Sequence, residues 1–134
     1  MAETSNPKTV WPCLVYDDAL EAIRFLVDAF GFDERIVVKD DDDPSAIHHA
    51  ELRWPEGGGV MLGSAGRGST LSGVPSGAGA VYVVTDHPDE LRDRAVAAGA
   101  ELVRDLQDEE YGSRGFTVRD PAGTSWSFGT YRGE

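Results

Sequence analysis

The side chains in this sequence whose types and spacing best suit chemistry are His49 and Glu51, two positions apart in the segment 47–54. This segment alternates apolar and polar residues, which predicts a strand with both side chains on one face. A histidine next to a carboxylate is suited to metal binding. Two ligands from one strand make an incomplete metal site, so a metal here would need a third ligand, such as Glu56 in the following turn.

Other reactive side chains are better explained by structural roles. Cys13 is the only cysteine of the chain, and no basic residue near it in sequence would activate its thiol. We therefore expect it to be a buried structural cysteine. Arg114 follows an acidic stretch, and we expect a salt bridge to Asp108, Glu109 or Glu110 in preference to a bound anion.

The charge of the chain restricts the partners it can have. The 134 residues include 12 Lys and Arg and 24 Asp and Glu, so the net charge is 12 − 24 = −12. Nucleic acids and anionic membranes require basic surfaces, so neither is an expected partner. A cationic small molecule would be attracted, although the same acidity also serves solubility alone.

The composition predicts a single soluble domain, residues 1–134. Hydrophobic residues make up 40% of the chain, enough for a packed core, and no apolar run approaches the length of about 20 residues that spans a bilayer. Residues 1–8 are polar and contain no apolar signal region. A single cysteine excludes an internal disulfide and suits a reducing compartment, so we expect a cytoplasmic protein.

Strand and helix signals occur in the same order twice. Each half is predicted to contain a strand, a helix that ends in a glycine, and three more strands. The first module covers about residues 9–63 and the second about 80–131, with a Gly- and Ser-rich linker at 64–79. The predicted strands are 9–16, 35–39, 47–54, 60–63, 80–84, 101–106, 116–119 and 125–131, and the predicted helices run from Asp17 or Asp18 to Phe30 and from Pro88, capped by Asp86, to Gly99.

The first predicted helix has two apolar faces. Its core stripe recurs at helical spacing and consists of Leu20, Ile23, Val27 and Phe30. Phe25 lies off that stripe, together with Ala22 and Ala29. This second face is expected to pack either on another chain or on the other half of the same chain, and the first alternative predicts a homodimer.

Three segments carry a resemblance to a known family: YDDALEAIRFLVDAFGF at 16–32, HAELRWPEGGGVMLG at 49–63 and YGSRGFTVRDPAGTSWSFGTY at 111–131. Together with the doubled element order, they resemble the vicinal oxygen chelate superfamily of glyoxalases, dioxygenases and bleomycin-resistance proteins, and most of all its bleomycin-resistance-like branch. The resemblance implies an α+β fold in which two βαβββ modules form curved mixed sheets around a cup, with the helices outside. The fold hosts several activities and does not by itself imply one.

Catalysts of this superfamily hold a divalent metal with one His, Glu or Gln side chain from each of the first, fourth, fifth and eighth strands. The positions that the resemblance assigns to these ligands carry Val10, Met61, Ala80 and Ser127. None of the four is a strong ligand for a hard or borderline cation. The sequence departs from the catalytic pattern at every position, and we expect neither a metal nor another cofactor.

The same placement predicts which side chains line the cup and could bind a ligand: His49, Glu51, Met61, Tyr82, Ser125, Ser127 and Tyr131. Their neighbours on the opposite face are expected to cover the helices, namely Leu52, Val83, Trp126 and Phe128. Glu51 is equally well explained as a partner for a cationic ligand and as a salt-bridge partner of Arg53 or Arg114.

The leading hypothesis is a metal-free small-molecule-binding protein that sequesters a cationic or aromatic toxic compound, as bleomycin-resistance proteins do in antibiotic resistance. An alternative is a glyoxalase-like enzyme of lyase or isomerase type, with a non-standard metal site at His49 and Glu51 or with no metal. A third is a regulatory or structural dimer whose cup has lost its function. Whether each cup forms within one chain or between two is left open.

Overall fold

The computed structural model describes residues 9–66, 71 and 73–133. The predicted polar segment 1–8 and part of the predicted linker, residues 67–70 and 72, lie outside the described residues. The strands are β1 (Cys13–Tyr16), β2 (Asp33–Lys39), β3 (Ile47–Arg53), β4 (Gly59–Ser64), β5 (Ala80–Val84), β6 (Glu101–Asp108), β7 (Arg114–Arg119) and β8 (Ser125–Gly129), and the helices are α1 (Ala19–Phe25), which continues as the π-helical turn η1 (Leu26–Phe30), and α2 (Pro88–Ala97).

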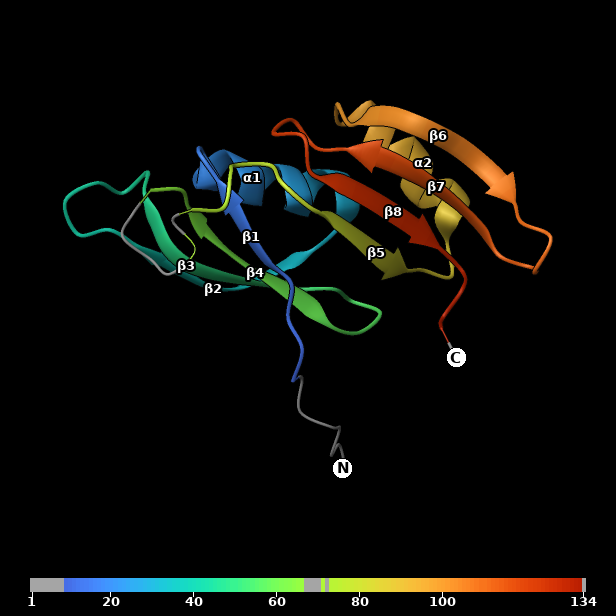
Figure 1. Cartoon of the computed structure of the whole chain (residues 1–134), viewed down its shortest axis with the longest axis horizontal. Coiled ribbons are helices and arrows are strands. Elements are labelled where there is room, and N and C mark those ends of the chain that lie inside the picture. The colour runs from blue at the N-terminus through green and yellow to red at the C-terminus, as the bar shows by residue number, and fades with distance from the viewer. Residues whose placement is uncertain (1–8, 67–70, 72, 134) are drawn as a thin grey trace.

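The strands form two four-stranded mixed sheets of the same topology. Their orders are β1-β4-β3-β2 and β5-β8-β7-β6. In each sheet the first and last strands of the module pair in parallel, and the remaining pairs are antiparallel. Figure 1 shows the two halves side by side along the long axis of the molecule. The fold is therefore α+β with two βαβββ modules, as predicted.

The first and last strands are shorter than the sequence predicts. Residues 9–12 lie outside β1, because Pro12 has no N–H to donate to the ladder, although its carbonyl still accepts a bond from the Met61 amide at 2.9 Å. The final strand ends at Gly129, so Tyr131 lies beyond it.

The two halves share one hydrophobic core on the helix side of both sheets. The predicted helix-covering residues are all buried there: Leu52, Val83, Trp126 and Phe128. Phe30 at the end of η1 lies against the second half, with its ring centroid 5.3 Å from that of Trp126 and 4.8 Å from that of Phe128. Aromatic contacts of this kind join the modules through apolar burial.

The second face of the first helix packs on the other half of the same chain, which decides between the two alternatives above. Phe25 is only 8% exposed, and Ala29 is fully buried. Phe25 and Ala22 face Pro121 and Ala122 of the second module across a cavity. The π-helical turn adds one residue to the last turn of the helix, which shifts Leu26 and Ala29 into the core beside the predicted stripe.

The second helix begins at Pro88, as predicted, but its N-cap lies one residue after the predicted Asp86. His87 holds the N-cap position and makes no side-chain capping bond, so Asp86 is not the cap. Pro88 occupies the first turn, where its missing N–H has no cost, and Gly99 follows the helix with a φ of 106°. Among the described residues, no helix has the length and apolar character needed to cross a membrane.

Candidate functional site

Three of the predicted site residues lie together on the open face of the first sheet, opposite the helices. Met61 pairs in register with Glu51 on one side and with Cys13 on the other. The Nε2 atom of His49 lies 2.8 Å from Oε2 of Glu51. Glu51 therefore has a hydrogen-bond partner in the sheet, but the partner is His49 and not the expected Arg53 or Arg114.

The prediction that Cys13 is buried is wrong. Cys13 is exposed, because β1 is an edge strand and its alternation places the thiol on the open face beside Met61. Two apolar side chains of β2 extend this face: Ile36, paired with Glu51, is 44% exposed, and Val38, paired with His49, is 46% exposed.

The other four predicted residues belong to the second half. Tyr82 pairs in register with Ser127, and Ser127 Oγ lies 2.8 Å from Thr117 Oγ1. The Tyr82 hydroxyl donates to the carbonyl of Tyr131 at 2.7 Å, while Ser125 is paired with Ala80. Burial raises the pKa of Tyr82, so this hydroxyl remains a neutral donor at physiological pH.

Tyr82 also borders a cavity of about 260 Å³ between the two halves, whose other walls include Pro12, Trp54 and the glycine turn 57–59. The remaining predicted site residues do not line this cavity or the two described below. The structure thus brings the predicted residues together as two groups, one on each sheet.

The strand register shows which residues pair near the four positions that the resemblance assigned to metal ligands. Val10 precedes β1 and is 88% exposed, and the residue that faces Met61 is Cys13. In the second half, Ser127 faces Tyr82 and not Ala80. The paired positions therefore carry a thiol, a thioether, a phenol and a hydroxyl, a donor set that does not fit the divalent metal of the superfamily's catalysts.

The sequence also offered Glu56 as a third ligand beside His49 and Glu51. The Glu56 carboxylate instead accepts bonds from Thr85 Oγ1 and from the Asp86 amide, both at 2.8 Å, and so belongs to the junction with the second half. Within the described residues, no three His, Cys, Asp or Glu side chains are placed to hold one metal ion.

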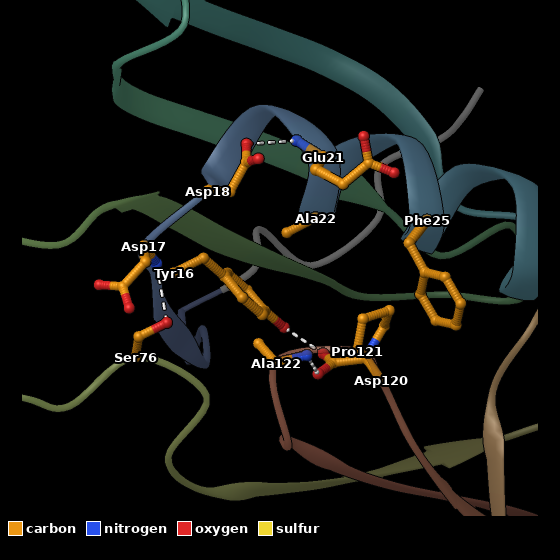
Figure 2. A pocket seen from close by; sticks show the side chains of 10 residues that line it. All are labelled: Tyr16, Asp17, Asp18, Glu21, Ala22, Phe25, Ser76, Asp120, Pro121 and Ala122. Atoms are coloured by element: carbon orange, nitrogen blue, oxygen red, sulfur yellow. Dashed lines mark hydrogen bonds between the residues drawn. The ribbon is translucent and has the colours of Figure 1, made fainter.

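Two further cavities lie at junctions between the halves. One lies between α1 and the β7–β8 turn, and the other lies between α2 and the β3–β4 turn. We call the cavity between α1 and the turn after β7 the first junction cavity, about 290 Å³ in volume. Its walls are Ala22, Phe25, Pro121, Ala122 and the ring of Tyr16 (Figure 2). The carboxylates among its lining residues are Asp17, Asp18, Glu21 and Asp120, and none of the described residues that line it is basic.

Asp120 holds the base of this cavity together. Its Oδ2 accepts from the Tyr16 hydroxyl at 2.6 Å (Figure 2) and from the Trp126 indole at 3.0 Å. Its Oδ1 accepts from the amides of residues 122–124. Burial, and next the negative charge of Asp120, raise the pKa of Tyr16 well above its ordinary value. The phenol therefore stays protonated and donates across the junction between the two modules.

The second junction cavity, of about 310 Å³, lies between α2 and the turn after β3. Leu91 and Arg94 line it from α2, and Trp54, Pro55 and Glu56 line it from the turn. The Arg94 guanidinium donates to the carbonyls of Asp28 and Val27 at 2.9 and 3.2 Å. This cavity therefore contains a cation supplied by the chain itself.

A short internal repeat that was not among the sequence predictions forms both turns. Residues 53–57 read RWPEG and residues 119–123 read RDPAG. The second residue of each repeat reaches the other half at the end of its first strand: the Trp54 indole donates to the Val84 carbonyl at 2.9 Å, and Asp120 accepts from Tyr16. The spacing of Arg, Pro and Gly was the available signal.

Comparison with known proteins agrees with this architecture. The profile of the Glyoxalase/Bleomycin resistance protein/Dioxygenase superfamily matches residues 8–128, and the chain belongs to this superfamily. It is 32% identical to TioX from Micromonospora sp. ML1, whose crystal structure superposes with a TM-score of 0.78 over 94% of this chain and 100% of that one.

Two other relatives extend the comparison. An uncharacterized protein of Mycobacterium tuberculosis (strain ATCC 25618 / H37Rv) is 35% identical over 127 residues, which cover 88% of this chain and 71% of that protein. A glyoxalase-related enzyme from Clostridium phytofermentans is 15% identical, with a TM-score of 0.66 over 96% of this chain and 98% of that one. At that identity the likeness concerns the fold alone.

Proposed function

We propose that this chain is a metal-free binding protein that holds an aromatic or cationic small molecule against the open face of its sheets. The observation that carries the proposal is the set of soft and apolar side chains there: Cys13 on the edge strand β1 beside Met61 on β4, with Ile36 and Val38 exposed on the opposite edge strand β2. Thioether and aliphatic groups pack on flat ligands without requiring one fixed geometry.

The charged and aromatic groups beside these side chains supply specificity. Glu51 is held by His49 at 2.8 Å and offers a carboxylate to a cation bound over Met61. Tyr82, 48% exposed on the second half, presents an aromatic ring for stacking. The overall charge of −12 raises the local concentration of a cationic ligand, and sequestration of a toxic compound would require nothing beyond this binding.

Ligand-induced stabilisation tests the proposal. Thermal unfolding is measured against cationic glycopeptides of the bleomycin type, aromatic cations, small carbonyls and thiols. A ligand at one hundred times its Kd stabilises the folded state by about 2.7 kcal/mol, which raises the Tm by several degrees. The variant Met61→Arg should lose this shift, and Val96→Arg, on the exposed side of α2, should keep it. No shift with any class, or an equal shift in Met61→Arg, contradicts the proposal.

One observation favours an enzyme as the second candidate. The His49–Glu51 pair is a histidine and carboxylate in contact on an open face, an arrangement suited to proton transfer. Elemental analysis after dialysis without chelator separates the two functions. Near-stoichiometric zinc, nickel, manganese or iron, lost together with lyase or isomerase activity in His49→Ala, would favour the enzyme.

We also propose that two copies of the chain pair in solution. The exposed apolar side chains of the open face, Ile36, Val38 and Tyr82, support this prediction in place of Phe25, which is buried within the chain. Light scattering that gives the monomer mass across micromolar concentrations would refute it.

A further inference from the structure

Each of the two sheets has two edge strands, and an edge strand presents backbone groups that another chain can bind. Two of these edges are engaged by the chain itself. On β1, the Val15 carbonyl accepts from the Gly77 amide at 3.1 Å. On β5, the Val84 carbonyl accepts from the Trp54 indole at 2.9 Å. The other two edges are β2 and β6.

The strands β2 and β6 differ in how their charges are satisfied. Every charged side chain of β6 has an ion-pair partner within the chain. The pairs are Glu101–Arg119, Arg104–Glu109, Asp105–Arg92 and Asp108–Arg114. On β2, Asp33 is paired with Arg53 at 2.9 Å, but within the described part of the chain Glu34, Arg35 and Lys39 make no ion pair. Most charges of β2 are therefore available to another molecule.

The apolar side chains of β2 are exposed as well. All of its side chains except Val37 are exposed, including Ile36 at 44% and Val38 at 46%. These three residues pair with β3 in unbroken register, because the register shifts between the two strands lie on either side of them. The strand also contains no proline, so every residue can donate to a ladder. The centre of β2 is therefore regular enough to accept a further antiparallel strand.

The charges of β2 are self-complementary when two copies of the strand run antiparallel. The strand begins with Asp33 and Glu34 and ends with Lys39. In an antiparallel pair related by a two-fold axis, the start of each strand lies beside the end of the other. When Ile36 faces its own copy, Lys39 of each copy stands opposite Asp33 of the other. Opposite charges placed in this way stabilise a strand pair.

The neighbouring registers lack this match. If Arg35 faced its own copy, two guanidinium groups would meet. If Val37 faced its own copy, Arg35 would stand opposite Lys39. Like charges directly opposite each other destabilise a strand pair, so the charge pattern favours the register centred on Ile36.

We propose that two copies of the chain associate through β2, by antiparallel pairing of the two β2 strands with Ile36 opposite itself. The inference names the surface for the pairing of copies proposed above and rests on that proposal. The first sheets of the two copies then form one continuous sheet, with four strands from each copy. Ile36 and Val38 of both copies form one apolar strip on the joined open face, beside the Glu51 that pairs with Ile36 in each copy. Because a single strand pair buries less area than a stable interface requires, the association is reversible and weak.

Cysteine cross-linking tests the register. In a Cys13→Ser background, which removes the native thiol, Ile36→Cys places two thiols opposite each other across the two-fold axis. This variant should form a disulfide-linked dimer under mild oxidation about tenfold faster than its controls. The matched control is Val38→Cys, which has nearly the same exposure on the same face but lies roughly 14 Å from its own copy in this register, too far for a disulfide. A second control is Val103→Cys on β6, also 46% exposed.

Charge variants test the pairing without a cross-link. Asp33→Lys places like charges opposite Lys39 at both ends of the interface, and Lys39→Glu does the same opposite Asp33. Each variant alone should self-associate about tenfold more weakly than the wild type in sedimentation equilibrium. An equimolar mixture of the two variants restores an opposite-charge pair at both ends and should associate as the wild type does. The mixture also controls for loss of the Asp33–Arg53 pair, because a second chain would not rescue a damaged fold.

The outcomes separate this inference from the proposals on which it rests. A monomer at millimolar concentration would refute the pairing of copies and this surface together. If the wild type self-associates but Ile36→Cys and Val38→Cys cross-link equally, or if the mixture shows no rescue, another surface pairs the copies and this inference alone is overturned. Met61→Arg, which should lose the bound ligand, lies on β4 and should self-associate as the wild type does. A failure of ligand binding is thereby distinguished from a failure of the β2 surface.

Discussion

The two junction cavities are built on the same framework but differ in the polarity of two lining side chains. In the second, Glu56 bonds to Thr85 and to the Asp86 amide, and Arg94 binds the carbonyls at the end of η1. In the first, Ala122 and Phe25 hold those two positions and reach no polar group of the other half. Two side chains thus give the second junction a cation and a carboxylate of the chain and leave both positions of the first junction apolar.

The contacts that the two repeated turns make with the other half also differ in polarity. At the second residue of the repeated turn, the first half carries Trp54, which makes one hydrogen bond and packs on Phe128 of the second half with a centroid distance of 6.0 Å. The second half carries Asp120, which is 5% exposed and accepts bonds from two side chains and three amides. One contact relies on apolar packing and the other on a buried charge.

The largest effect is expected for Asp120→Ala. The change leaves the Tyr16 hydroxyl and the Trp126 indole buried without an acceptor, and it removes the carboxylate that orders the turn. We expect a loss of about 3–4 kcal/mol in the free energy of unfolding, measured in urea. Tyr16→Phe removes one donor and should cost only about 1–2 kcal/mol.

The control for Asp120 is Asp93→Ala, an exposed carboxylate on α2 that should change the stability by less than about 0.5 kcal/mol. A loss of under about 1 kcal/mol in Asp120→Ala would show that water replaces the carboxylate, and the polar contact would then be no stronger than its apolar counterpart.

A smaller effect is expected for Glu56→Ala, which copies Ala122 of the first junction. Thr85 Oγ1 and the Asp86 amide lose their acceptor just before α2, a change comparable to the loss of a helix cap. We expect the free energy of unfolding to fall by about 1 kcal/mol. Glu34→Ala, on the exposed edge strand β2, removes the same charge without these bonds and should have a smaller effect. Equal losses would assign the effect to net charge.

The doubled element order could be predicted from the sequence because each helix and strand carries its own period and ends at a glycine or a turn. The alternation in β3 placed His49 and Glu51 together, and the pairing confirms that they share a face. Local patterns were less informative about where a strand begins or ends. The exposed position of Cys13 depends on where β1 begins, which Pro12 determines by lacking an N–H.

The junction cavities could not be predicted from local patterns, because they depend on contacts between distant residues. Tyr16 and Asp120 are 104 positions apart, and each is ordinary in its own segment: one ends a strand and the other begins a turn. The burial of Phe25 depends on the second half as well, since its helix alone gives it no core to face. The recurrence of RWPEG as RDPAG was visible in the sequence, and only the structure shows what it does.

The smallest effect concerns how each helix is tied to its sheet. Asp89, in the first turn of α2, binds the guanidinium of Arg114 on β7 through both carboxylate oxygens, at 2.8 and 3.1 Å, and Arg114 also contacts Asp108 as the sequence predicted. The corresponding position of α1 is Leu20, which packs against the core instead. The second half thus uses an exposed ion pair where the first uses apolar contact.

Hydrogen bonding from Arg114 lowers the pKa of Asp89 below its ordinary value of 3.8. A depressed pKa contributes stability above the unfolded value, and this contribution disappears as the pH falls through the folded value. The urea midpoint of Asp89→Asn should therefore lie slightly below that of the wild type from pH 7 to about 5, and the gap should close below pH 3.8. Added salt should narrow the gap at neutral pH, because the pair is exposed.

Glu90→Gln, in the same helical turn but outside any ion pair of the described chain, should show a smaller gap that reflects the helix dipole alone. An equal gap in both variants, or one that persists in acid, would mean that the Asp89–Arg114 pair contributes nothing to stability and that both helices are held by apolar packing.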